Sequence, residues 1–461
     1  MSDLSQIAYL VTAALFILGI MRLRSPATAR SGNTLAAIGM AIAIITALAN
    51  AGGNYPIIAI GIVVGAAVGF VAARTVRMTA MPQMVALFNG MGAGAAALVA
   101  LGETTNQLPA SGTLSAGPTT AAVFSILVGS LSFSGSLIAF AKLQELMTGR
   151  PVTFPQQNLV NAVLLVVLVL LGAYLVLIHT DGIALALLAL GGLALGVLFV
   201  LPVGGADMPV IISLLNSCTG LSAAATGFVV GNNALVVGGI LVGASGTILT
   251  ILMSQAMNRS LFNVLFSAFG SAVVSPAGPA AIGQQTVRSA SAEDVANLLA
   301  YSSSLIIVPG YGLAVARAQQ EVREITEMLE KRGVSVKFAI HPVAGRMPGH
   351  MNVLLAEANI PYTQLYEMDA INPEFSHTDV ALVVGANDVT NPAARNDPHS
   401  PIYGMPIINA DQARTVVVMK RSMSPGFAGI DNPLYYNPKT LMFFGDARES
   451  LLKLIAALKE V

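Results

Sequence analysis

Two glycines follow a short apolar run in the C-terminal half of the chain. Residues 305–309 are Leu-Ile-Ile-Val-Pro, and Gly310 and Gly312 stand on either side of Tyr311 directly after them. An apolar strand, a glycine turn and a helix in this order are typical of dinucleotide sites, because glycines let the backbone approach a pyrophosphate. The free N–H groups and the dipole of the helix N-terminus favour its negative charge. Val315 holds the third glycine position, so this stretch alone fits a plain strand-helix turn equally well.

More segments rich in glycine or polar residues follow apolar runs, at residues 341–350, 385–392, 420–429 and 445–447. In a parallel sheet, ligands bind at the carboxyl ends of the strands, so these segments should meet around one site. The candidate cofactor-binding residues are Gly310, Tyr311, Gly312, Val315, Val343, Ala344, Gly345, Arg346, Gly385, Ala386, Asn387, Asp388, Lys420, Arg421, Ser422, Gly426, Phe427, Gly445, Asp446 and Ala447.

Charge decides between the two nicotinamide dinucleotides. An NAD site usually offers an acidic residue near the end of the second strand, where it holds the ribose 2′-hydroxyl. The corresponding residues here, 339–341, include no acid. Lys420, Arg421 and Ser422 form a basic, hydroxyl-bearing cluster that suits a 2′-phosphate. The residues therefore favour NADP(H), although a solvated Lys-Arg pair at a strand end stays an open alternative.

A metal site is not indicated. His341 and His350 are nine positions apart and have no pair of carboxylates nearby, and Cys218 is the single cysteine. Zinc sites in proteins are built from closely spaced Cys, His and acidic ligands. We therefore expect no metal, and one cysteine also excludes an internal disulfide.

The elements that would position these segments alternate between strand and helix. After a helix capped by Ser291, we expect helices at 313–332, 350–358 and 447–458. The apolar runs predict strands at 305–309, 334–340, 381–384, 415–420 and 441–444. This alternation favours a Rossmann-like α/β domain with a doubly wound parallel sheet.

The composition places the other half of the chain in a membrane. The 461 residues are 55% hydrophobic and 10% charged, with a mean hydropathy of +0.73. Residues 1–253 hold seven of the 23 Lys and Arg residues and five of the 23 Asp and Glu residues. We predict a transmembrane domain at 1–253, a linker at 254–290 and a water-facing α/β domain at 291–461. A net charge of zero gives no argument for nucleic-acid binding.

Nine apolar segments of nearly spanning length predict a membrane α-helical bundle. They lie at about 4–21, 34–50, 56–73, 82–101, 119–141, 159–178, 183–201, 208–230 and 232–253. The first could be mistaken for a signal peptide, but Asp3 precedes it while Arg22 and Arg24 follow it. That charge order favours a retained helix.

The basic residues of this half predict its orientation. All of them lie in alternate loops, which are cytoplasmic under the positive-inside rule. They are Arg22, Arg24, Arg30, Arg74, Arg77, Lys142 and Arg150. The N-terminus is therefore expected outside, and after nine spans the C-terminal domain is expected in the cytoplasm.

Several polar and small residues lie within the predicted spans. Asn89 lies near the middle of the fourth segment, Asp207 at the start of the eighth, and Asn216 within the eighth. Such groups are costly in hydrocarbon without partners or water. A water or proton path is one explanation, and hydrogen bonds between neighbouring helices are another. Glycines at a spacing of four predict tight helix packing at Gly61, Gly65, Gly69, Gly239 and Gly243.

Long motifs resemble the β subunit of the proton-translocating NAD(P) transhydrogenases of the Re/Si-specific type. They are the segments at 204–209, 256–260, 310–312, 341–358, 385–388 and 420–422. The resemblance covers essentially the whole chain. It implies that this chain binds NADP(H) and that a separate α subunit binds NAD(H). Hydride transfer between the two would be coupled to inward proton flow and would produce NADPH, in a dimer of α–β units embedded in lipid of the bacterial inner membrane.

The resemblance also implies roles for single residues. Residues 310–312 and 343–346 would hold the nicotinamide and pyrophosphate region of a nucleotide that lies reversed on the sheet. The cluster at 420–422 would hold the 2′-phosphate, and 424–429 would form a lid. The residues implied in proton coupling are Asp388, Asn216, Asn89, Asp207 and His341. No covalent catalytic residue is expected, since hydride transfer is the cofactors' own chemistry.

The chain departs from its relatives at two implied sites. Asn89 stands where many relatives have a histidine, and an amide cannot titrate. Either the partner subunit supplies the titrating group, or water bridges Asn89 and Asn216. Phe427 stands where relatives often have a tyrosine, so a hydroxyl contact is missing there.

A dinucleotide-gated channel or transporter with a sensing Rossmann domain is the alternative function. Against it stand the NADP-type basic cluster and the lack of a filter loop or an ion-binding carboxylate within the spans.

Overall fold

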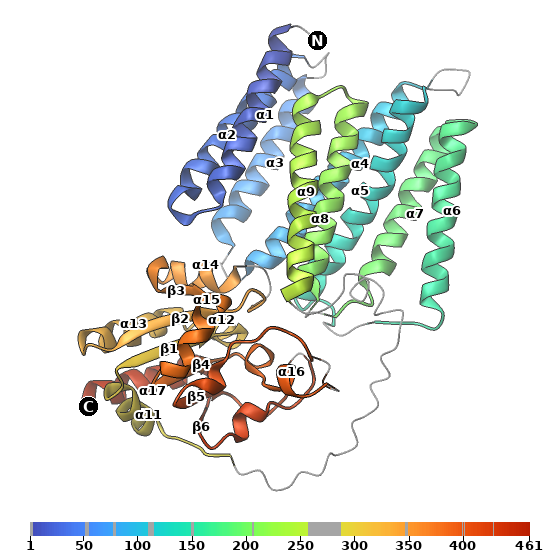
Figure 1. Ribbon diagram of the computed structural model, residues 1–461. Coiled ribbons are helices and arrows are strands. Elements are labelled where there is room, and N and C mark those ends of the chain that lie inside the picture. The colour runs from blue at the N-terminus through green and yellow to red at the C-terminus, as the bar shows by residue number, and fades with distance from the viewer. Residues whose placement is uncertain are drawn as a thin grey trace. The chain divides into compact units, whose positions relative to one another are not determined.

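The computed structural model describes residues 3–50, 55–76, 80–108, 115–148, 152–204, 207–256, 287–345, 349–398, 400, 402–426 and 428–461. The chain separates into two compact units (Figure 1). Among the described residues, those up to Ile251 form a helical unit and those from 287 onward belong to an α/β unit. The domain limits expected from the sequence stay a prediction, because most of the linker at 254–290 lies outside the described residues.

The helical unit confirms the nine apolar segments as helices. Within the described residues they are α1 (Asp3–Leu23), α2 (Pro26–Ala49), α3 (Tyr55–Thr75), α4 (Met81–Asn106), α5 (Ala116–Leu143), α6 (Gln157–Leu177), α7 (Gly182–Val200), α8 (Met208–Val229) and α9 (Asn233–Ala256). Each is long and apolar enough to cross a membrane. The second helix begins earlier than expected, because Pro26 fits the first turn, where its missing N–H is not needed.

Small residues let α8 and α9 approach closely (Figure 1). A Cβ added at Gly239 would meet the backbone of Gly220 and Ala224, and Ser217 Oγ donates to Gly243 O at 2.8 Å. The predicted tight packing at Gly239 is thus confirmed. The other predicted stripe behaves differently, since no described atom of the chain comes within 4 Å of a Cβ added at Gly61, Gly65 or Gly69. No described residue of α3 is buried, so its glycines pack against nothing in the described part of the chain.

The α/β unit is built on a six-stranded parallel sheet in the order β3-β2-β1-β4-β5-β6. Its strands are β1 (Ser304–Pro309), β2 (Ser335–Ile340), β3 (Leu365–Glu367), β4 (Val380–Val384), β5 (Thr415–Lys420) and β6 (Thr440–Phe444). The predicted Rossmann-like class is confirmed. The strand order reverses between β1 and β4, which is where ligands bind in such sheets. Strand β3 was not expected, because three residues give no periodic signal.

Apolar cores cover both faces of the sheet. One face packs on helices α11 (Ala292–Ala300), α12 (Tyr311–Ala316), α13 (Gln319–Lys331), α14 (His350–Glu357) and α17 (Ala447–Glu460). The other packs on α15 (Met368–Ile371) and on the short helices η3 (Asn372–His377), η5 (Ala410–Gln412) and η6 (Pro433–Tyr436). The central strands β1, β4 and β5 are buried on both sides, which explains their continuous apolar runs. The cap at Ser291 is confirmed, since its hydroxyl accepts from Asp294 N.

The single helix expected at 313–332 is wrong. It is broken at Arg317, which has the left-handed φ of 52° and separates α12 from α13. The N–H groups of Arg317 and Ala318 bond to Ala314 O and Leu313 O and end the first helix. No glycine or asparagine marks this position, so the sequence carries no signal for the break.

The contact between α8 and α9 yields a stability test. A Cβ at Gly220 would lie 2.8 Å from Gly239 O, so Gly220→Val should force the two helices apart. Overpacking of this kind costs about 1–3 kcal/mol. We expect the melting temperature of the purified full chain in detergent to fall by several degrees. Gly65→Val is the matched control and should leave the temperature unchanged, because nothing in the described chain is near it. Equal effects in both variants would refute this packing.

Candidate functional site

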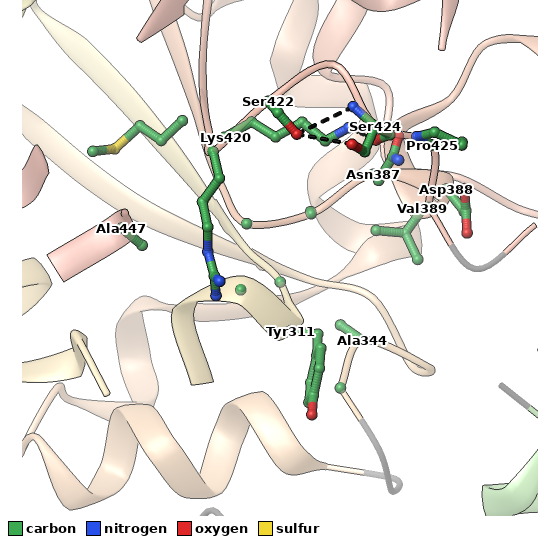
Figure 2. A pocket seen from close by; sticks show the side chains of 18 of the residues that line it. Tyr311, Ala344, Asn387, Asp388, Val389, Lys420, Ser422, Ser424, Pro425 and Ala447 are labelled. Carbon is green, nitrogen blue, oxygen red and sulfur yellow. Dashed lines mark hydrogen bonds between the residues drawn. The ribbon is translucent and has the colours of Figure 1, made fainter. Parts of the chain in front are cut away.

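A cavity of about 410 Å³ opens at the carboxyl edge of the sheet, where the strand order reverses. Figure 2 shows Asn387, Asp388 and Val389 beside Ser424 and Pro425, with Tyr311 and Ala344 across from them. The expected residues that line the cavity are Gly310, Tyr311, Gly312, Val343, Ala344, Gly345, Gly385, Ala386, Asn387, Asp388, Lys420, Arg421, Ser422, Gly426, Gly445 and Ala447. Tertiary structure thus brings the ends of five strands together.

Four expected residues stand apart from this set. Val315 does not line the cavity and is half exposed on α12. Asp446 does not line it either, but its Oδ2 lies 3.7 Å from Nε of Arg421. Arg346 and Phe427 lie outside the described residues.

The glycines after β1 are pressed against the turn after β4. A Cβ added at Gly310 would overlap the backbone of Ala386, and one at Gly312 would lie 2.7 Å from Gly385 Cα. The N–H groups of Gly310 and Gly312 donate to Val384 O and Gly385 O, each at 2.9 Å. These two amides are therefore bonded within the chain, and the free N–H groups expected at the helix N-terminus do not include them. Their glycines are needed because two backbones touch at the point where the strand order reverses.

A buried histidine fixes the turn after β2. His341 is 1% exposed, Val343 N–H donates to its Nδ1 at 3.2 Å, and Nε2 lies 2.8 Å from Pro406 O. Because Nδ1 accepts, Nε2 carries the proton and donates to Pro406. Burial lowers the pKa of His341 to about 4, although Pro406 O and the Asp369 carboxylate favour the charged form. A proton-coupling role for His341 stays a prediction, and one that a ring held neutral disfavours.

The turn after β4 carries Asn387 and Asp388, and Gly426 and Ala428 of the segment after β5 pack against it. Asp388 Oδ2 accepts from Ala428 N at 3.0 Å. A Cβ added at Gly426 would lie 2.6 Å from Asp388 Oδ1 and 2.7 Å from Asn387 Nδ2. Only a glycine lets this segment lie this close to the two side chains.

The basic cluster after β5 faces the same cavity. Lys420 Nζ donates to Ser424 O, and Ser422 Oγ lies 2.9 Å from Ser424 Oγ. Burial lowers the pKa of Lys420, while the carboxylates of Asp388 and Asp431 act in the opposite direction. The cluster offers an ammonium, a guanidinium and a hydroxyl along one wall, which suits a phosphate.

Four cavity residues, Val389, Met419, Ser424 and Pro425, were not among the candidate cofactor-binding residues, although Ser424 and Pro425 belonged to the expected lid. Met419 is the buried residue of β5 just before Lys420, and Val389 follows Asp388. Both are apolar, so neither residue type marks a site. Their positions beside a strand end were the only usable signal.

In the helical unit, polar side chains meet between α4, α5 and α8. Asn89 Nδ2 donates to Ser136 Oγ at 2.9 Å. One turn away on α5, Ser132 Oγ lies 2.7 Å from Thr219 Oγ1 on α8. Asp207 is buried at the start of α8, and Asn216 is half-buried within that helix. Among the described residues, no hydrogen bond joins Asn89 to Asn216.

Known proteins match this chain over both its helical unit and its α/β unit. The sequence profile of the family described as NAD(P) transhydrogenase beta subunit matches residues 5–457. Two relatives named NAD(P) transhydrogenase subunit beta, both from Rhodospirillum rubrum, are 49% identical over 463 aligned positions. The alignment covers 99% of this chain and 99% of each relative.

The buried histidine yields a pH test. The folded-state pKa of His341, about 4, lies below the ordinary 6.5, so the unfolded chain takes up the proton more readily between these values. Stability should therefore fall as the pH drops from 6.5 towards 4, by at most about 2 kcal/mol at pH 5. His341→Gln should lower the melting temperature of the full chain at pH 7.5 and reduce its further fall at pH 5.

The control is His377→Gln, which replaces an exposed histidine and should keep the pH dependence of the parent chain. An unchanged pH dependence in His341→Gln would mean that the ring does not stay neutral in the folded chain.

Proposed function

Because this chain belongs to the family of NAD(P) transhydrogenase beta subunits, we propose that it binds NADP(H) in the cavity of its α/β unit. A partner alpha subunit binds NAD(H), and a hydride passes directly between the two nucleotides. Inward proton flow through the membrane drives the reaction toward NADPH. The word beta in the relatives' name supports the existence of an alpha partner. Nine helices of spanning length among the described residues support a membrane setting.

The residues that line the cavity favour NADP(H) over NAD(H). Lys420, Arg421 and Ser422 line it, and no acidic residue stands at 340–345 after β2. An ammonium and a guanidinium form charge-assisted hydrogen bonds with a phosphate. Asn387 Nδ2 is buried and has no hydrogen-bond partner among the described residues, so a donor is available at the same cavity. These features fit a 2′-phosphorylated dinucleotide better than NAD(H).

The chain's part in the reaction is to bind the nucleotide and to shield it from water. NADP(H), when bound, supplies the hydride chemistry. The turns at 310–312 and 343–345 hold the nicotinamide and pyrophosphate region, and the cluster at 420–422 holds the 2′-phosphate. The segment 424–429 acts as a lid that excludes water. No side chain forms a covalent bond with the substrate, so the rate depends on position and on exclusion of solvent.

The protonation state of Asp388 determines whether its carboxylate can hold the lid. Its Oδ2 accepts from Ala428 N, so the carboxylate form holds the lid, and protonation at that oxygen would remove the acceptor. Nucleotide binding and proton binding then bias the same movable element, which is the requirement for coupling.

The membrane route runs beside the polar contact of α4, α5 and α8. Asn89 and Asn216 organise water there, and Asp207 stands at its cytoplasmic mouth. Because amides do not titrate, a helix of the partner subunit supplies the titrating group. The assembly is a dimer of α–β units in the lipid of the bacterial inner membrane, with the N-terminus outside and the α/β unit in the cytoplasm.

Removing the basic cluster tests the cofactor assignment. Lys420→Ala with Arg421→Ala should weaken NADPH binding by at least about tenfold, since charge-assisted hydrogen bonds contribute about 1.5–3 kcal/mol each. NADH binding should change little. Fluorescence titration of the purified full chain measures both. Arg323→Ala with Lys331→Ala removes the same charge from α13, outside the cavity, and serves as control. Unchanged NADPH affinity would remove the basis for NADP(H).

A liposome assay tests the activity and the membrane route. The α–β complex should reduce an NAD analogue with NADPH and move protons, whereas this chain alone should pass none. Asn216→Leu should cut coupled turnover by at least about fivefold, the effect of a barrier raised by about 1 kcal/mol. NADPH binding should persist. Thr120→Leu, at an exposed position of α5, is the control. Absence of transhydrogenation in the parent complex would leave the gated-channel function as the better explanation.

A further inference from the structure

A tyrosine behind the cavity contacts both of its polar walls. Tyr435 lies in η6 and is 1% exposed, within the apolar core on one face of the sheet. Its hydroxyl reaches the turn after β4, and its ring lies under the basic cluster after β5. It does not line the cavity itself.

The hydroxyl of Tyr435 sets the orientation of Asn387. It donates to Asn387 Oδ1 at 2.6 Å, and Asn432 Nδ2 donates to the same oxygen at 3.1 Å and to Asn387 O at 3.2 Å. Two donors on Oδ1 determine which way the amide faces. Asn387 Nδ2 is thereby directed away from the core, toward Gly426 of the lid segment.

The ring of Tyr435 holds the ammonium of Lys420. Lys420 Nζ lies 5.0 Å from the ring centroid, within the range of a cation–π contact. An ammonium has three N–H donors, and Ser424 O accepts one of them. The ring fixes the position of the charge without fully satisfying the remaining donors, so they stay available to a phosphate.

We propose that Tyr435 is a positioning residue that determines dinucleotide specificity through Lys420 and nucleotide affinity through Asn387. The inference rests on the proposed function for the identity of the ligand. A residue that only filled the core would need neither the hydroxyl nor the aromatic face, and any apolar side chain of similar volume would serve.

Two substitutions separate the parts of the side chain. Tyr435→Phe keeps the ring and removes the hydroxyl, whereas Tyr435→Met removes both. Tyr436→Phe is the control, because it deletes the neighbouring hydroxyl, which donates to Asp431 Oδ2 at an equal 2.6 Å. The dissociation constants of NADPH and NADH are measured on the purified full chain by fluorescence, and melting temperatures are recorded in parallel.

The two variants should change the affinities for NADPH and NADH in different ways. In Tyr435→Phe, both affinities should fall by a similar factor, about threefold to tenfold for one lost hydrogen bond, and their ratio should hold within about twofold. In Tyr435→Met, the preference for NADPH over NADH should fall by a further threefold to tenfold or so, the effect of a lost cation–π contact. Adding Lys420→Ala should abolish this second effect, because the ring acts only through Lys420.

Each contrary result has a defined meaning. A loss of preference already in Tyr435→Phe, or unaltered affinities in that variant, would overturn the inference even if Tyr435→Met fails to fold. So would an unchanged preference in a folded Tyr435→Met chain. If the parent chain binds NADPH no better than NADH, the cofactor assignment itself fails, and the inference with it. A parent chain that prefers NADPH while its variants break the pattern refutes the inference alone.

Discussion

Contact between two backbones at the centre of the sheet organises the α/β unit. Where the strand order reverses, Gly310 and Gly312 lie directly against Gly385 and Ala386, and no Cβ fits between them. The amides of both glycines that follow β1 bond to carbonyls at the end of β4. All four of these residues line the cavity, so the contact forms part of its wall. A glycine motif that resembles a pyrophosphate cradle thus serves first to join two strands.

Most buried polar groups follow a second constraint, which is that burial without a hydrogen-bond partner costs free energy. The His341 ring accepts from Val343 N–H and donates to Pro406 O. The Asn387 Oδ1 atom accepts from the side chains of Tyr435 and Asn432. Buried His341 fixes one turn that lines the cavity, and buried Tyr435 and Asn432 fix the other. The helical unit obeys the same rule with hydroxyls, as Ser132 shows with Thr219 on the facing helix. Positioning and stability are therefore properties of the same hydrogen bonds.

The lid segment connects binding to the proton in the proposed mechanism. Gly426 packs on the Asn387–Asp388 turn, and the carbonyl of Ser424 accepts from Lys420. The same few residues thus hold the lid and line the cavity. In that proposal, movement of the lid would change the contacts of Asp388 and Lys420 together, because one short segment touches both.

The sequence by itself determined most elements and their order, but not strand β3 or the separation of α12 from α13. Nine apolar segments, the alternation of strand and helix, and the polar residues after each strand follow from periodicity and composition, which are local properties. Most cavity residues were predicted because parallel strands place their carboxyl ends at one edge. Tertiary structure alone decided the rest. The break at Arg317 is visible only in the structure, although the hydrogen bonds that form it are local. The neutral ring of His341, the bonded amides of Gly310 and Gly312, and the role of Tyr435 depend on contacts with residues distant in the chain. No local pattern encodes them, because each arises from which backbone or side chain the fold brings alongside.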